Sequence, residues 1–263
     1  MKEHQSKAAR IKSMKGKQSV VSLTGYDYAT GRLLDEAGVD LILVGDSLGM
    51  VVLGFPDTTH VTMDHMLHHV AAVARGAKMA LIVGDLPIHS YDTPEQAVEN
   101  AKRLHEAGAD AVKLEGGVRQ QAKVKAIVDA GIPVLGHMGM LPQRVLEEGG
   151  YKKKGKSESE AEAILEGCLA LQEAGVFGIV LESVVGSAAM MLTEKLSVPT
   201  IGIGCGNANC DGEVAVITDI VGAYPWFVPP FATVRANVAA DTKAAAIAYA
   251  DAVRSGEGAA RHV

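Results

Sequence analysis

The stretch LILVGD at residues 41–46 decides the fold, because an apolar run there passes through a glycine and ends on an acid. A short continuous apolar run bounded by glycine is typical of a strand buried on both faces, as in a parallel sheet. The same pattern returns as ALIVGD at residues 80–85 and as AVKLEG at residues 111–116. The sequence therefore predicts three parallel strands that each deliver a carboxylate to one end of the sheet.

Apolar runs and helical patterns alternate along the rest of the chain. Strands are expected at residues 19–24, 40–45, 79–84, 110–115, 133–136, 177–181, 199–203 and 213–218. Thr62 and Thr93 are expected to cap two of the intervening helices, the second with Pro94 at its first position. Eight strands alternating with helices favour a single (β/α)8 TIM barrel, and an open doubly wound sheet is the alternative. In either fold the C-terminal strand ends form the active face.

Composition supports one globular domain. Of the 263 residues, 48% are hydrophobic and 21% are charged, and this length suits a barrel domain of roughly 250 residues. We interpret residues 1–263 as a single domain with a helical lead-in at 1–17 and a helical, alanine-rich tail at about 229–263. The lead-in is basic without an apolar centre, so we expect a surface helix rather than a secretory signal.

Charge and cysteine content narrow the expected partners and compartment. The formal net charge of −6 argues against a nucleic-acid surface. No apolar stretch approaches the roughly 18 uncharged residues of a transmembrane helix, so we expect neither nucleic acid nor membrane as a partner. The three cysteines are too few for a disulfide framework and their spacing fits no structural zinc motif, which indicates a reducing cytoplasm.

Charged and polar side chains stand at the predicted C-terminal strand ends: Asp46, Asp85, Lys113, Glu115, His137 and Glu182. In a closed barrel these ends converge on one mouth. Two carboxylates 4 Å apart repel by about 4 kcal/mol at an effective dielectric near 20, a large cost for a fold stable by about 5–15 kcal/mol. Either one carboxylate is protonated or a cation lies among them. Two aspartates and a glutamate suit Mg²⁺ better than Zn²⁺.

Two of these residues, Lys113 and His137, have a second interpretation. Lys113 and Glu115 point to the same side of a strand; if that side is the interior, the buried ammonium must meet carboxylates or an anionic substrate. The alternative is an edge lysine that extends into solvent, although a barrel has no edges. His137 is as well explained as a satisfied core histidine as by a functional role. Burial of Glu182 would raise its pKa and suit it to proton abstraction.

Several sequence blocks together resemble one enzyme family. They are GYD at 25–27, VGDSLGM at 44–50, VTM at 61–63, DLP at 85–87, VKLEGG at 112–117, GHMG at 136–139, GGYK at 149–152 and GIG at 202–204. Their collinear order over roughly residues 5–220 is similar to that of ketopantoate hydroxymethyltransferase, also called 3-methyl-2-oxobutanoate hydroxymethyltransferase.

The resemblance implies an activity, a fold group and an assembly. Such enzymes transfer a hydroxymethyl group from 5,10-methylenetetrahydrofolate to 2-oxoisovalerate (3-methyl-2-oxobutanoate), giving ketopantoate through a Mg²⁺-stabilised enolate in pantothenate biosynthesis. They are similar to the barrels of the phosphoenolpyruvate mutase group and usually assemble as homodecamers.

The resemblance also implies roles for individual residues. Asp46, Asp85 and Glu115 would hold Mg²⁺, and the two aspartates would thereby also take part in substrate binding. Ser47 and Lys113 would bind the oxo acid, His137 would line the pocket, and Glu182 would be the base. Departures from the family pattern come after residue 203, at Cys205, Glu213, Thr218-Asp219 and residues 224–231. They bear on what the resemblance implies for folate binding, for the oligomer contacts and for the last strand.

Other functions are consistent with parts of the pattern. A Mg²⁺-dependent carbon–carbon lyase or mutase acting on 2-oxo acids would use the same carboxylates. Such lyases often carry a cysteine in a loop near the mouth, and none lies between Asp85 and His137. A phosphate-binding barrel would use residues 202–207 as an anion cradle, but no lysine or arginine lies nearby. A non-enzymatic binding protein would leave the carboxylates unexplained.

Overall fold

The structure is a computed structural model that describes residues 3–206 and 209–256. Contacts divide the chain into two compact units, Met1–Ala215 and Val216–Val263, and each is described by itself. Among the described residues, no helix is both long enough and apolar enough to cross a membrane. The first unit contains the sheet and the whole set of strand-end residues. The assignment of residues 1–263 to one domain therefore stays a prediction.

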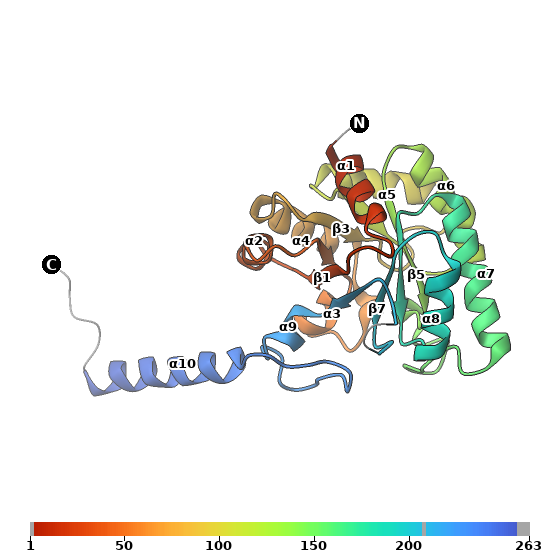
Figure 1. Cartoon of the computed structure of the whole chain (residues 1–263). Helices are drawn as coiled ribbons and strands as arrows, with labels where there is room; N and C mark the ends of the chain where they lie inside the picture. Colours follow the sequence, from red (N-terminus) through yellow and green to blue (C-terminus); the bar gives the residue numbers. More distant parts are fainter. Residues whose placement is uncertain (1–2, 207–208, 257–263) are drawn as a thin grey trace. The chain divides into compact units, whose positions relative to one another are not determined.

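The first unit is a closed barrel of eight parallel strands, ordered as in the sequence (Figure 1). The strands are β1 (Val20–Thr24), β2 (Leu41–Val44), β3 (Leu81–Asp85), β4 (Ala111–Lys113), β5 (Val134–Gly139), β6 (Gly178–Glu182), β7 (Thr200–Ile203) and β8 (Gly212–Ala215). The register of β1 with β8, from Val20 opposite Gly212 to Leu23 opposite Ala215, closes the ring. The (β/α)8 prediction is confirmed and the open sheet is wrong.

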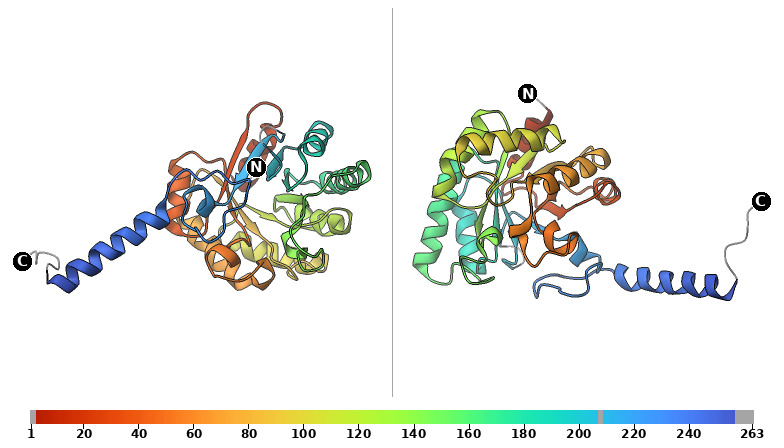
Figure 2. Two further views of the ribbon diagram at one scale, coloured as in Figure 1. Left: turned by 90° about the horizontal axis from the view of Figure 1, so that it is seen from below. Right: turned by 180° about the vertical axis from the view of Figure 1, so that it is seen from behind.

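Helices surround the barrel, as the views in Figure 2 show. The longer ones are α2 (Tyr28–Glu36), α4 (Met63–Gly76), α5 (Pro94–Glu106), α6 (Gln121–Asp129), α7 (Glu158–Ala174) and α8 (Gly186–Lys195). Short segments lie in the loops: α3 (Leu48–Val51), η1 (Thr58–His60), η2 (Val118–Gln120) and η3 (Pro142–Arg144). The predicted caps are confirmed, since Thr62 and Thr93 each accept a hydrogen bond from the backbone three residues on.

Helix α1 (Glu3–Ser13) closes the N-terminal end of the barrel. Ile11 is fully buried, and with Ala8 and Met14 it belongs to one apolar cluster with the first residues of three strands, Val20, Leu41 and Leu81. The expected surface helix is present, with Ala9, Arg10, Lys12 and Ser13 exposed, and it has a buried face that was not predicted. Burying a side chain such as Ile11 contributes roughly 1.5–3 kcal/mol. The apolar plug leaves the C-terminal end as the open one.

The chain after β7 differs from the prediction in two places. Strand β8 ends at Ala215, where its pairing with β1 ends, and residues predicted to continue it form helix α9 (Ile217–Ile220) in the second unit. The predicted helical tail begins later than residue 229, as α10 (Val238–Ser255), which buries no residue. Pro229 and Pro230 lack backbone N–H donors, which disfavours a helix through them.

Candidate active site

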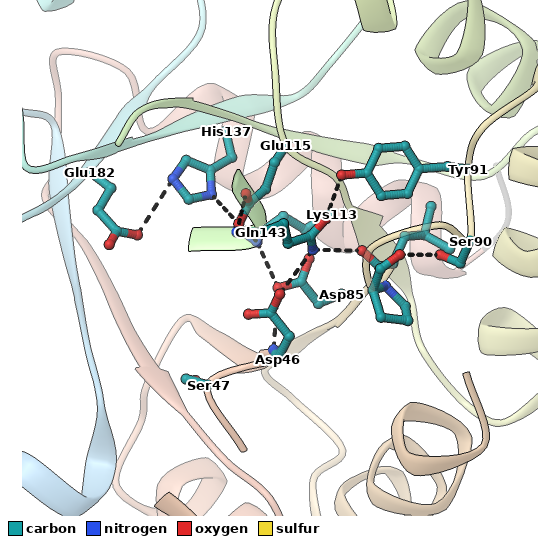
Figure 3. A network of polar contacts seen from close by, with 12 residues as sticks. Asp46, Ser47, Asp85, Ser90, Tyr91, Lys113, Glu115, His137, Gln143 and Glu182 are labelled. Atoms are coloured by element: carbon teal, nitrogen blue, oxygen red, sulfur yellow. Dashed lines mark hydrogen bonds and ion pairs between the residues drawn. The ribbon is translucent and has the colours of Figure 1, made fainter. Parts of the chain in front are cut away.

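The strand-end residues converge at the C-terminal mouth of the barrel (Figure 3). Asp46 follows β2, Asp85 ends β3, Lys113 ends β4 with Glu115 two residues on, His137 lies in β5 and Glu182 ends β6. Five of these residues (Asp46, Asp85, Lys113, Glu115 and His137) are at most 4% exposed. The barrel therefore gathers, in a dry interior, the side chains that the sequence predicted to meet.

Lys113 lies among the carboxylates. Its Nζ donates a hydrogen bond to Asp85 Oδ2 at 2.6 Å and lies 3.8 Å from Glu115 Oε1. Burial alone would lower the pKa of Lys113, but the fields of Asp85, Glu115 and Asp46 outweigh it and raise the pKa above its ordinary value. The ammonium thus points into the barrel and stays charged, and the outward-pointing alternative is wrong.

The negative charge of the carboxylates at the mouth exceeds the positive charge of Lys113. Burial raises the pKa of Asp85 to about 7; Lys113 opposes the shift and Asp46 adds to it. Burial also raises the pKa of Asp46, and it raises the pKa of Glu115 well above its ordinary range. Three acids share one ammonium, so each holds its proton more tightly than in water. Additional positive charge would be stabilising at this mouth.

His137 lies between two acids. Its Nδ1 is 3.5 Å from Glu115 Oε1 and its Nε2 is 3.5 Å from Glu182 Oε2. Burial, followed by the charge of Lys113, lowers the pKa of His137 well below its ordinary value. Neither ring nitrogen makes a hydrogen bond within the described residues. His137 is thus a buried imidazole between two acids, and its pocket-lining role stays a prediction.

Glu182 is a partly exposed carboxylate with a raised pKa. Burial raises its pKa to about 8; Lys113 opposes this shift, while Asp46 and Asp85 add to it. Its side chain is 19% exposed, so it lies at the boundary between the dry network and solvent. Ser47 lies at another edge of the network, where its hydroxyl is 2.9 Å from the Tyr26 hydroxyl. Contact of Glu182 and Ser47 with a bound substrate stays a prediction.

Two site residues were missed by the sequence analysis. Gln143, in η3, is 3% exposed and donates hydrogen bonds to Asp46, Leu86 and Glu115. Tyr91 is buried and donates its phenol proton to Gln143. Both follow strand ends by several residues, inside segments without hydrophobic periodicity. The sequence carries no signal that separates them from ordinary loop residues.

The oxygen donors at the mouth fit a hard divalent cation. Asp85 Oδ1 and Glu115 Oε1 are buried and make no hydrogen bond within the described residues. The Asp46 backbone N–H lies 3.4 Å from Asp85 Oδ2, which makes these two acids neighbours, whereas Lys113 lies between Asp85 and Glu115. Among residues 3–206 and 209–256, no three His, Cys, Asp or Glu side chains are arranged as a ready ligand set. The assignment of all three acids as metal ligands stays a prediction.

Comparison with known proteins identifies the family of this chain. The family model described as ketopantoate hydroxymethyltransferase matches residues 5–258. The chain belongs to the ketopantoate hydroxymethyltransferase family. A relative from Ignicoccus hospitalis named 3-methyl-2-oxobutanoate hydroxymethyltransferase is 54% identical, over 94% of each chain. One of the same name from Aeropyrum pernix is 52% identical, over 95% of this chain and 90% of its own.

Solved structures place this ketopantoate hydroxymethyltransferase family member among related barrels. A putative phosphonomutase from Burkholderia cenocepacia aligns with a TM-score of 0.66 at 16% identity, over 96% of this chain and 99% of its own. A 2,3-dimethylmalate lyase of the PEP mutase/isocitrate lyase superfamily aligns with a TM-score of 0.61 at 15% identity, over 97% and 90%. At such identities the likeness shows the fold alone, which is the predicted one.

Proposed function

We propose that this enzyme transfers a hydroxymethyl group from 5,10-methylenetetrahydrofolate to 3-methyl-2-oxobutanoate, giving ketopantoate for pantothenate biosynthesis. The names of relatives about half identical in sequence support the reaction. The single observation that carries the chemistry is the buried group of Asp46, Asp85, Glu115 and Lys113, with Glu182 beside it.

Charge explains why an oxo acid needs a cation here. Three buried carboxylates and one ammonium would repel the carboxylate of an incoming oxo acid. In this proposal Asp46, Asp85 and Glu115 would hold Mg²⁺. When bound, Mg²⁺ supplies a Lewis acid toward the keto group and neutralises the excess charge. Lys113 and the Ser47 hydroxyl contribute the remaining polar contacts to the oxo acid.

Glu182 removes the C3 proton of the oxo acid in this proposal. Its raised pKa of about 8 makes the carboxylate a stronger base than an exposed glutamate. His137 lies beside that carboxylate, with its Nε2 3.5 Å from Glu182 Oε2, and burial lowers the pKa of His137 well below its ordinary value. General base catalysis of this kind contributes roughly 10²–10⁴-fold. In the complete reaction, the enolate carbon forms a bond to the one-carbon unit, water supplies the oxygen of the new hydroxymethyl group, and both carbon–nitrogen bonds of that unit to the folate break, leaving tetrahydrofolate and ketopantoate.

Deuterium exchange at C3 of 3-methyl-2-oxobutanoate tests this function. In deuterium oxide with Mg²⁺, we expect exchange without the folate, and formation of ketopantoate only when 5,10-methylenetetrahydrofolate is added. Exchange followed by carbon–carbon cleavage without folate would instead indicate the lyase or mutase alternative. Absence of both exchange and product would contradict the proposal.

We also propose a cytoplasmic homo-oligomer, with the homodecamer implied by the family resemblance. Light scattering coupled to gel filtration of the full chain measures the assembly mass directly. A stable monomer at micromolar concentration would contradict this part of the proposal and leave the proposed reaction intact.

A further inference from the structure

Gln143 connects the segments that follow four neighbouring strands of the barrel. Its backbone N–H donates to Glu115 Oε2 at 3.1 Å. Its side-chain Nε2 donates to Asp46 Oδ2 at 2.9 Å and to the Leu86 carbonyl oxygen at 3.0 Å. Its Oε1 accepts the Tyr91 phenol proton at 2.5 Å. A buried primary amide with both donors and its acceptor occupied is fully satisfied and held in place.

The Leu86 carbonyl and the Tyr91 phenol together determine which end of the Gln143 amide faces Asp46. The Leu86 carbonyl can only accept a hydrogen bond, so the NH₂ end must point toward it and toward Asp46. The Tyr91 phenol, on the opposite side, supplies a proton to Oε1 (Figure 3). If the amide were turned by 180°, its oxygen would face the Leu86 carbonyl and a carboxylate, leaving buried groups unpaired.

The amide also has the right charge for this location. Asp46, Asp85 and Glu115 already exceed the charge of Lys113, so another acid would add repulsion and another base would compete with an arriving cation. A neutral side chain gives Asp46 a hydrogen bond without changing this balance. Outer partners of metal-binding carboxylates typically change metal affinity by 10–100-fold.

We propose that Gln143 is a positioning residue for the divalent-cation site, holding one carboxylate oxygen of Asp46, and that Tyr91 acts through it by fixing its amide. This inference rests on the cation site of the proposed function. It adds to that function two residues that do not themselves touch the reacting atoms.

Binding of Mn²⁺, followed by electron paramagnetic resonance on the full chain without oxo acid or folate, tests the proposal. The variants are Gln143→Met, Tyr91→Phe and the double variant. Gln143→Met keeps the volume and the backbone N–H and is expected to weaken Mn²⁺ binding about 10–100-fold. Tyr91→Phe is expected to weaken it less. The double variant should bind like Gln143→Met alone, because Tyr91 has then lost the group through which it acts.

A matched control separates positioning from packing. Gln120 is another buried glutamine, 5% exposed, whose Oε1 accepts from Lys123 rather than contacting Asp46. Gln120→Met should leave Mn²⁺ affinity unchanged, whatever it does to thermal stability. At saturating Mn²⁺, Gln143→Met should recover most of the wild-type C3-exchange rate, because the substitution lowers the affinity for the cation and not the rate of the loaded enzyme. A merely structural role would lower the exchange rate at saturating Mn²⁺ as well.

The outcomes distinguish this inference from the proposed function. If wild type binds Mn²⁺ and folded Gln143→Met binds it equally well, only the inference fails. An equal loss from Tyr91→Phe in both backgrounds would show that Tyr91 acts independently, which also overturns it. If Gln143→Met does not fold, wild-type affinity in Tyr91→Phe overturns it. If wild type binds no Mn²⁺, the cation site fails together with the inference.

Discussion

The two ends of the barrel differ in how their acidic side chains are paired with basic ones. At the N-terminal end, three aspartates that precede strands each pair with one basic residue of the lead-in: Asp40 with Arg10 at 2.8 Å, Asp110 with Lys7 at 3.1 Å and Asp211 with Lys15 at 2.8 Å. Each aspartate also accepts a backbone N–H from the start of a strand, Val21, Ile82 or Thr200. Each of these three aspartates is both ion-paired and hydrogen-bonded.

At the C-terminal end, the acids share Lys113 and remain partly unsatisfied. Buried oxygens of Asp85 and Glu115 make no hydrogen bond within the described part of the chain. Burial raises the pKa values of Asp85 and Glu182 to about 7 and about 8. The N-terminal end therefore stabilises the fold, whereas the C-terminal end stores electrostatic strain that a cation and an oxo acid would relieve. Substitutions at the two ends should affect different measurements.

The largest expected effect comes from Glu182 at the strained end. Glu182→Gln removes the base while keeping the shape, and the C3-exchange rate should fall roughly 10²–10⁴-fold with oxo-acid binding retained. Wild-type exchange should rise with pH toward the pKa of about 8, because the base must lose its proton to act. Glu213→Gln, an exposed glutamate on β8, is the matched control. Unchanged exchange in Glu182→Gln would exclude it as the base.

The second-largest expected effect comes from the N-terminal end of the barrel and is a loss of folding stability alone. Ile11→Ala removes a fully buried side chain from the plug of the N-terminal end. The free energy of unfolding should fall by about 2–5 kcal/mol, the usual range for such cavities. Denaturant melts measure this loss, and the exchange rate per folded molecule should stay unchanged. A selective loss of exchange would contradict the separation of the two ends.

The residues of the strained end could be predicted from the sequence better than those of the stable end. Asp46, Asp85 and Glu115 follow a repeated apolar-glycine-acid or apolar-lysine-acid pattern, so their meeting followed from barrel geometry alone. Gln143 and Tyr91 lie in loops, where position depends on tertiary contacts that no local period reveals.

The lead-in and the last strand show the same limit. A helical lead-in was expected at residues 1–17 and α1 lies within it, but its buried face was not predicted, because a helix covering a barrel end has no strand pattern beside it. Strand β8 was predicted too long because Val216 and Ile217 are apolar, whereas its length is set by where β1 stops pairing. Local sequence patterns predict that a helix or strand is present, whereas its contacts with neighbouring helices and strands determine where it ends.

A pair of matched substitutions compares the two ends directly. Asp110→Asn breaks the ion pair with Lys7 and should destabilise the fold by about 1–3 kcal/mol. Asp85→Asn removes an acid whose pKa is higher folded, about 7, than unfolded, about 3.9. The folded state therefore stays protonated at Asp85 to a higher pH than the unfolded chain. Without a divalent cation, the free energy of unfolding of the wild type should fall as the pH rises from about 4 through 7.

Asp85→Asn should therefore flatten that decline with pH while abolishing Mg²⁺-dependent activity. Denaturant melts in EDTA across this pH range test the stability part, with Asp110→Asn as the contrasting variant. A pH dependence in Asp85→Asn as steep as in wild type would show that Asp85 is not strained. Full wild-type activity in EDTA would remove the cation from the proposal.

The smallest effect tests how much the paired end depends on single charges. Arg10 is 48% exposed, and its ion pair with Asp40 is backed by the Val21 N–H, which also donates to Asp40. Because exposed pairs contribute about 0–1 kcal/mol, Arg10→Gln should change the free energy of unfolding by less than about 1 kcal/mol, and less still in high salt. A loss as large as that of Ile11→Ala would show that charge pairing, rather than the apolar plug, closes this end of the barrel.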